Sequence, residues 1–164
     1  MASAPLRVDL AGGWTDVAPF PSDFGGEVVN FAINKRVVAT HDVKSRDCPT
    51  EIDLPVPRGS GLGTSSAMHV AISALLSNME APRPRKIAEE AFKIEHRSGN
   101  LCGRQNHWAS ALGGFNHLLF IGDSVEEMPF EPAKSAKNWL KKHLIISFSG
   151  TSRNSGEMQR SVWE

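Results

Sequence analysis

The amino-acid sequence predicts a mixed α and β fold, because segments typical of strands and segments typical of helices alternate along a domain-sized chain. The 164 residues are 40% apolar and 22% charged, which is ordinary for a globular domain with a sizeable core. No internal repeat or low-complexity linker interrupts the chain. These three observations favour one α+β domain and exclude a disordered or collagen-like chain.

The balance of charge and the lengths of the apolar runs argue against nucleic-acid-binding and membrane-spanning proteins. Lys and Arg total 18, as do Asp and Glu, so no charge excess favours nucleic acid or an acidic membrane surface as a partner. No apolar run approaches the roughly 20 residues that a membrane-spanning helix needs. Residues 1–5 lack a secretion-signal pattern, so we expect a cytoplasmic protein. Cys48 and Cys102 are far apart and indicate neither a disulfide framework nor a zinc site.

Strands are predicted from β-branched and apolar runs that end at glycine or proline. The first of them leads into Gly12 and Gly13, which permit a tight turn or the close approach of a ligand. Pro55 and Pro57 end the weakest of them. The predicted strands are residues 6–10, 28–29, 36–43, 52–54, 115–121 and a buried strand at 143–149.

Helices are predicted where apolar residues recur every three or four positions. The strongest pattern is that of Met68, Ile72, Leu75 and Met79. Pro84 suits the first turn of the next helix, which ends before Ser98-Gly99-Asn100. The predicted helices are residues 64–79, 84–97, 105–112, 134–142 and a further one beginning at 155.

A glycine-rich turn precedes the most strongly patterned helix. Residues 57–67, PRGSGLGTSSA, contain three glycines, and Thr64, Ser65 and Ser66 place three hydroxyl side chains where the free N–H groups and the dipole of a helix start attract anions. No lysine precedes the hydroxyl residues, so this is not a Walker A loop, and the glycine spacing does not match the dinucleotide fingerprint. These residues alone leave two interpretations open: a phosphate-binding loop, or an ordinary turn with Thr64 as the N-cap.

Four segments resemble the GHMP kinases, named for galactokinase, homoserine kinase, mevalonate kinase and phosphomevalonate kinase. Residues 57–67 are similar to the family's glycine-serine phosphate loop, and residues 4–16, APLRVDLAGGWTD, to its first motif. The wording AGGWTD resembles the heptose-phosphate kinase and L-fucose kinase branch. Residues 103–115 are similar to the segment that carries the catalytic Asp, and residues 150–156 resemble a Ser-Arg turn near the start of the second domain.

This resemblance implies a GHMP kinase N-terminal domain of the ribosomal protein S5 domain 2-like type. We expect it to occupy residues 1–164 and to end at the start of a second domain that is largely missing, so that a second domain or chain completes the active site. The implied function is ATP-dependent phosphorylation of a sugar or sugar-phosphate hydroxyl, the anomeric one of heptose 7-phosphate or L-fucose type. The alternatives are a non-catalytic nucleotide- or sugar-binding remnant and an unrelated anion-binding module.

The resemblance also implies roles for single residues, with ATP and Mg²⁺ as cofactors. The implied set is Arg7 and Asn106 for catalysis; Asp16 and Trp14 for the sugar; Thr64, Ser65 and Glu95 for Mg²⁺; and Gly59, Ser60, Gly61, Leu62, Gly63, Thr64, Ser65 and Ser66 for ATP. For two of these residues the alternatives are simple, an exposed strand charge for Arg7 and a turn-stabilising carboxylate for Asp16.

Two positions call for more argument. Glu95 shares a helical face with apolar residues, so its carboxylate needs a cation, which is either Mg²⁺ or a basic side chain such as Arg97 or Arg104. Asn106 stands where the family has its catalytic Asp, and a carboxamide does not accept a proton as a carboxylate does. General-base help is worth about 10²–10⁴-fold. His107 is a poor substitute, because neighbours on a helix point about 100° apart.

Overall fold

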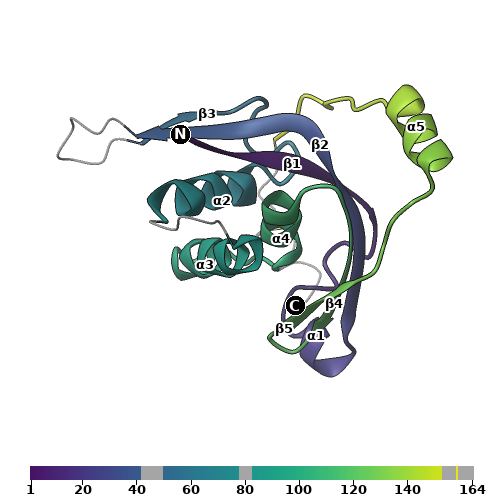
Figure 1. The fold of residues 1–164 in the computed structure, drawn as a ribbon. Coiled ribbons are helices and arrows are strands. Elements are labelled where there is room, and N and C mark those ends of the chain that lie inside the picture. The colour runs from purple at the N-terminus through teal and green to yellow at the C-terminus, as the bar shows by residue number, and fades with distance from the viewer. Residues whose placement is uncertain (42–49, 78–82, 153–157, 159–164) are drawn as a thin grey trace.

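An antiparallel five-stranded sheet forms the frame of the protein, with β2 at its centre (Figure 1). The computed structural model describes residues 1–41, 50–77, 83–152 and 158. The strands follow the order β1-β2-β4-β5, and β3 pairs with the far end of β2. They are β1 (Ala2–Ala11), β2 (Gly26–His41), β3 (Thr50–Asp53), β4 (Phe115–Ile121) and β5 (Ser124–Met128).

Strand β2 corrects one prediction, because it is a single strand of 16 residues where the sequence suggested two. The exposed residues Asn34, Lys35 and Arg36 in its middle concealed its continuity. Pairing with β1 keeps this stretch extended, since Pro5 lies opposite Arg36 and the partners continue on both sides of a register shift. Figure 1 shows that β2 bends strongly along its length. Its first residues pair with β4 and its last residues pair with β3.

Helices α2 and α4 lie against the concave side of this sheet, and α3 packs on both of them (Figure 1). Small residues at the contact, such as Ala67 and Ala71 of α2, lie fully buried and let the helix approach Leu6 and Val37 of the sheet closely. The three helices are α2 (Thr64–Leu76), α3 (Pro84–Arg97) and α4 (Gln105–Leu112); the other two are α1 (Phe20–Asp23) and α5 (Lys134–His143). Helix α5 lies apart from the others and buries none of its residues.

Most of the predicted elements are confirmed, and α3, α4 and β4 agree with their predicted bounds. Helix α2 ends at Leu76, before residues 78–82, which lie outside the described part of the chain. The helix predicted from 155 also lies outside it, except for Met158, which is helical. Helix α1 and strand β5 were not predicted. No helix among the described residues is long and apolar enough to cross a membrane.

The buried strand predicted at 143–149 is wrong. Residues 144–149 form no strand, and Ile145 is 88% exposed, with Leu144, Ile146 and Phe148 also exposed. An apolar run becomes a buried strand only where another strand pairs with it and a second layer covers it. Neither is present beside this segment in the described part of the chain, so the apolar side chains remain at the surface.

Candidate active site

The glycine-rich turn forms an open loop at the start of α2. Gly59, Gly61 and Gly63 have φ values of 74°, 81° and 71°, in the left-handed region that favours glycine. Gly63, rather than Thr64, is the N-cap of α2, and no side chain caps this helix end. The hydroxyl of Thr64 instead lies 3.3 Å from that of Ser60. The interpretation of Thr64 as a simple N-cap is therefore wrong. Among the described residues no side chain caps the N–H groups of the first turn, which are positioned to receive an anion.

The carboxylate of Glu95 lies beside this helix start. Ser65 donates a hydrogen bond to Glu95 Oε1 at 2.5 Å, and Ser66 donates one to Oε2 at 3.0 Å. His107 Nε2 also lies 2.7 Å from Oε2, and His69 Nδ1 lies 3.6 Å from it. The alternative, an ion pair of Glu95 with Arg97 or Arg104, is not formed among the described residues: Arg104 pairs with Glu89 and Asp123.

These contacts keep Glu95 ionised although it is only 4% exposed. Burial by itself disfavours the charged form, but the contacts with His107, Ser65 and His69 outweigh burial and lower the pKa of Glu95 to about 2. An ionised carboxylate next to a serine hydroxyl offers the hard oxygen ligands that Mg²⁺ prefers. Glu95 and Ser65 therefore fit a Mg²⁺ site, whereas the Thr64 hydroxyl turns toward Ser60.

Arg7 connects the loop to α4. Its Nη1 donates to the carbonyl oxygen of Gly61 at 2.7 Å, and its Nε donates to Asn106 Oδ1 at 2.8 Å. The same Nε lies 3.1 Å from Asp9 Oδ1. Arg7 is 7% exposed, so it is not the exposed strand charge that was the alternative. The structure thus brings the two predicted catalytic residues together, directly beside the predicted phosphate loop.

Asp16 occupies a different environment from an open sugar cleft. It is 4% exposed, and its two oxygens accept hydrogen bonds from the backbone N–H and the side chain of Gln105 at 2.8 and 3.0 Å. Burial raises the pKa of Asp16, and the bonds from Gln105 oppose that rise. Gly103 leaves the room for this arrangement, because a Cβ there would lie 1.9 Å from Asp16 Oδ2. In this structure Asp16 anchors the start of α4, and its contact with a sugar stays a prediction.

Trp14, the other predicted sugar contact, is held in an unusual backbone conformation. Its φ of 75° is the one left-handed value among the described residues other than glycine. The turn around it is fixed by Thr15, whose N–H and hydroxyl both donate to the carbonyl oxygen of Gly12. The ring is partly exposed. A strained backbone at a partly exposed aromatic residue is typical of functional turns, and stacking on a sugar stays a prediction.

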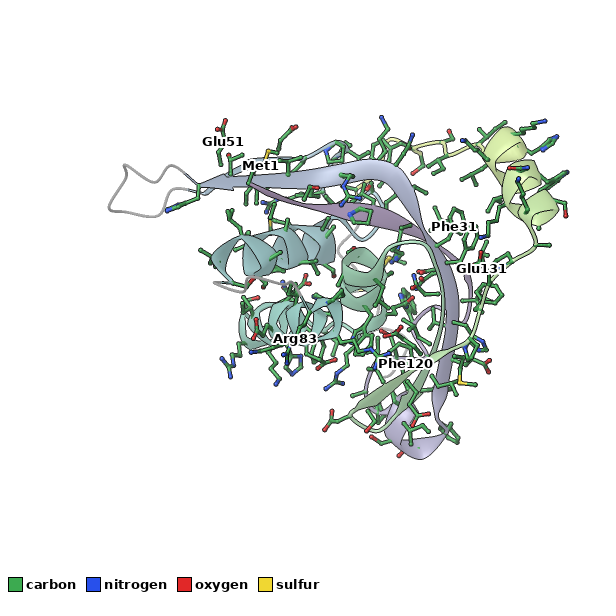
Figure 2. All side chains as sticks on the ribbon, in the orientation of Figure 1. Met1, Phe31, Glu51, Arg83, Phe120 and Glu131 are labelled. Atoms are coloured by element: carbon green, nitrogen blue, oxygen red, sulfur yellow. The ribbon has the colours of Figure 1, made fainter. Side chains whose placement is uncertain are left out.

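A cavity of about 650 Å³ lies between the bend of β2 and helix α5 and reaches the loop at Pro57, Ser60 and Leu62. Figure 2 shows Phe31 at this bend and Glu131 on the segment that leads to α5. Other lining residues are Ile33, Phe115, Lys137, Leu140, Lys141, Ile146 and Phe148. No sequence pattern predicted this cavity, because its walls come from segments about 100 residues apart.

Comparison with known proteins identifies the family. The model of the GHMP kinases N terminal domain matches residues 30–114, which is more than half of the chain. The chain belongs to the GHMP kinases. The match covers most of β2, together with β3, the loop, α2, α3 and α4, and so includes both Glu95 and Asn106.

Individual relatives of this GHMP kinase chain include sugar kinases. The D-glycero-alpha-D-manno-heptose 7-phosphate kinase of Campylobacter jejuni is 25% identical over an alignment of 210 positions, which covers 94% of the chain and 61% of that protein. The L-fucokinase/L-fucose-1-P guanylyltransferase of Bacteroides fragilis is 57% identical, but only over 30 residues, or 18% of the chain and 3% of that protein.

Among solved structures, a D-glycero-D-manno-heptose 1-phosphate kinase from Bacteroides thetaiotaomicron superposes with a TM-score of 0.73 at 25% identity. The match covers 85% of this GHMP kinase chain and 62% of that one. The fold is therefore the α+β fold of a GHMP kinase N-terminal domain. The chain spans about three fifths of the length of these relatives.

Proposed function

We propose that this GHMP kinase chain binds ATP and Mg²⁺ and forms part of an enzyme that transfers the γ-phosphate to a sugar or sugar-phosphate hydroxyl. The observation that carries the proposal is the arrangement around Gly61, where an uncapped helix start, the buried Arg7 and the ionised Glu95 surround one loop. Phosphoryl transfer depends mostly on positioning and on charge stabilisation, and these groups supply both.

Each group has a role within this proposal. The N–H groups at the start of α2 would hold phosphate oxygens, and the left-handed Gly59, Gly61 and Gly63 let the backbone approach them. Arg7 would stabilise the transferring phosphoryl group, for which its planar guanidinium is suited. Mg²⁺, held by Ser65 and Glu95, would neutralise charge on the phosphates.

The class of acceptor is proposed from the relatives. The heptose 7-phosphate kinase and the L-fucokinase named above suggest that the acceptor is a heptose 7-phosphate or L-fucose, phosphorylated at the anomeric hydroxyl. Trp14 and Asp16 lie next to the turn that follows β1 and would contact this sugar. A domain spanning residues 1–164, completed by a second domain or chain, belongs to the same proposal.

A second candidate is a nucleotide- or sugar-binding protein without catalytic activity. One observation favours it: the carboxamide of Asn106, where the sequence resemblance implies the family's catalytic Asp, accepts a hydrogen bond from Arg7. Under this alternative, the chain binds Mg·ATP but transfers no phosphate to a sugar.

Calorimetry with Mg·ATP tests the nucleotide site. We expect Ser65→Ala to weaken binding by about tenfold, since each hydrogen bond to a charged group is worth about 1.5–3 kcal/mol. Ser22→Ala, at an exposed serine of the remote helix α1, is the matched control and should bind as the parent does. Equal affinity of the parent and Ser65→Ala would contradict the assignment of Ser65.

An assay of phosphate transfer separates the two functional candidates. The parent protein, completed by its second domain or partner chain, is incubated with radiolabelled ATP, Mg²⁺ and either D-glycero-D-manno-heptose 7-phosphate or L-fucose, and labelled sugar is measured. Labelled product supports the kinase. Binding of Mg·ATP without any labelled sugar supports the non-catalytic alternative.

A further inference from the structure

A further carboxylate, that of Asp9, lies beside Arg7 in the candidate site. Asp9 follows Arg7 by two residues on β1, so both side chains point to the same face of the strand. Arg7 Nε lies 3.1 Å from Asp9 Oδ1 and donates to Asn106 Oδ1 at 2.8 Å. One N–H group is thus flanked by a carboxylate oxygen on one side and a carboxamide oxygen on the other.

The other nearby acidic groups are already engaged. Asp16 is 4% exposed and accepts two hydrogen bonds from Gln105. Glu95 is 4% exposed and is held by Ser65, Ser66 and His107. Asp9, in contrast, keeps 25% of its side chain exposed, and its Oδ1 has no partner beyond Arg7 among the described residues. Asp9 is therefore the carboxylate at this site that a ligand can reach.

We propose that Asp9 accepts the proton of the acceptor hydroxyl, in place of the carboxylate that position 106 lacks. The inference rests on the proposed kinase function, which supplies ATP as the phosphoryl donor. As the hydroxyl oxygen forms its bond to the γ-phosphorus, the bond from that phosphorus to the β,γ-bridging oxygen breaks. The hydroxyl proton passes to the Asp9 carboxylate, and the electron pair of the broken bond leaves with ADP.

The environment of Asp9 suits this role. Gly13 lies across from it, so that even a Cβ at that position would remain 3.9 Å from Asp9 Oδ2. Oδ1 is buried and lies 3.1 Å from Arg7 Nε, so Oδ2 is the oxygen that would accept the proton. Burial raises the pKa of Asp9, and Arg7 opposes the rise. A carboxylate with a raised pKa is a stronger base, provided that it is still ionised at the working pH.

The test is single-turnover phosphate transfer by the full chain, completed by its second domain or partner chain, with L-fucose and D-glycero-D-manno-heptose 7-phosphate as acceptors. Asp9→Asn preserves shape and should slow transfer by about 10²–10⁴-fold, with Mg·ATP affinity unchanged by calorimetry. Asn106→Asp, added to Asp9→Asn, should restore at least about tenfold of the loss, because it returns a carboxylate to the other side of Arg7 Nε. Asp53→Asn, at an exposed aspartate of β3, is the matched control and should transfer as the parent does.

The pH profile provides a readout that a structural role of Asp9 does not affect. The charged groups that face Asp9 are Arg7 and Asp16. The parent's rate should fall as pH is lowered and Asp9 takes up a proton, and this acidic limb should vanish in Asp9→Asn.

Three results would overturn the inference, each in a recognisable way. Equal rates for Asp9→Asn and the parent would remove Asp9 as the base and leave the kinase function standing. A slow Asp9→Asn that keeps the acidic limb and is not rescued by Asn106→Asp would reduce Asp9 to a structural role. A parent that binds Mg·ATP and transfers no phosphate would overturn the kinase function and, with it, the role of Asp9.

Discussion

Replacing Gly103 with alanine tests how tightly the site is built around Asp16. A Cβ at position 103 would lie 1.9 Å from Asp16 Oδ2 and 2.3 Å from its Cγ, so the carboxylate must move. Its hydrogen bonds from the backbone and side chain of Gln105 would then lengthen or break. The backbone of Gly103 is not left-handed, so the clash, rather than strain in φ, causes the effect.

The expected loss of stability follows from these contacts. Overpacking a buried site costs about 1–3 kcal/mol, and each hydrogen bond lost by a buried carboxylate costs about 1.5–3 kcal/mol. Since the carboxylate can relax in part, we expect Gly103→Ala to lower the free energy of unfolding by about 3–6 kcal/mol. That is a large part of the roughly 5–15 kcal/mol that stabilises a typical domain.

Urea denaturation followed by circular dichroism measures this loss. With a slope of about 2 kcal/mol per molar urea, the midpoint should fall by roughly 1.5–3 M. Gly13→Ala is the matched control: its Cβ would meet nothing closer than 3.9 Å, so its free energy of unfolding should stay within about 1 kcal/mol of the parent's. If Gly103→Ala were as stable as Gly13→Ala, the anchoring of α4 by Asp16 would be refuted.

Three further predictions concern Glu95, the contrast between the buried Leu6 and the exposed apolar residues 144–149, and the acceptor. Because the pKa of Glu95 is about 2 in the folded protein against a usual 4.5, its contribution to stability is present above about pH 4.5 and is lost as pH falls toward 2. The gap in unfolding free energy between the parent and Glu95→Gln, about 2–3 kcal/mol at pH 7, should therefore shrink over that range in urea titrations. Leu6→Ala removes a side chain with no exposed surface and should lower the free energy of unfolding by about 2–5 kcal/mol. Ile145→Ser, at an exposed side chain, should change it by less than about 0.5 kcal/mol in thermal denaturation. A large loss for Ile145→Ser would mean that residues 144–149 are covered in solution. Asp16→Ala should weaken binding of L-fucose or heptose 7-phosphate at least tenfold in ligand-observed NMR and leave Mg·ATP binding unchanged, and equal sugar binding would limit Asp16 to its contact with Gln105.

The sequence predicts well those helices whose ends and apolar faces are set by their own residues. Helices α3 and α4 could be bounded from the sequence because proline and glycine stand at their ends and apolar residues recur with the helical period. The length of β2 could not, since pairing with β1, not its own residues, keeps its exposed middle extended. The run at 143–149 failed for a related reason: its composition is that of a buried strand, and no local pattern tells whether a partner covers it.

The sequence predicted some residues of the candidate site, but not the contacts between them. Glu95 stood out as a carboxylate on an apolar helical face, and the structure confirms that it needs partners, although they are serines and histidines rather than arginines. The contact of Arg7 with Asn106 joins residues 99 positions apart and required the fold. Asp9 was missed, although its spacing of two from Arg7 on a predicted strand was a usable signal, because strand residues two apart share a face.

The distribution of charge around Arg7 bears on how an acceptor is oriented. One guanidinium lies near two carboxylates, Asp9 and Asp16, and the proximity of these carboxylates raises the pKa of Asp16 further. Such a site attracts hydroxyl groups, which donate to carboxylates, and repels a second phosphate, which does not. If the acceptor is a sugar phosphate, its own phosphate is therefore expected to bind away from Asp9 and Asp16, while a hydroxyl at the other end of the sugar faces Arg7. A neutral sugar such as L-fucose carries no phosphate to be repelled. In the orientation described, the positive charge added by Asp9→Lys should therefore not improve binding of heptose 7-phosphate relative to L-fucose. Such an improvement would show that the phosphate of the acceptor lies near position 9 and that the orientation is wrong.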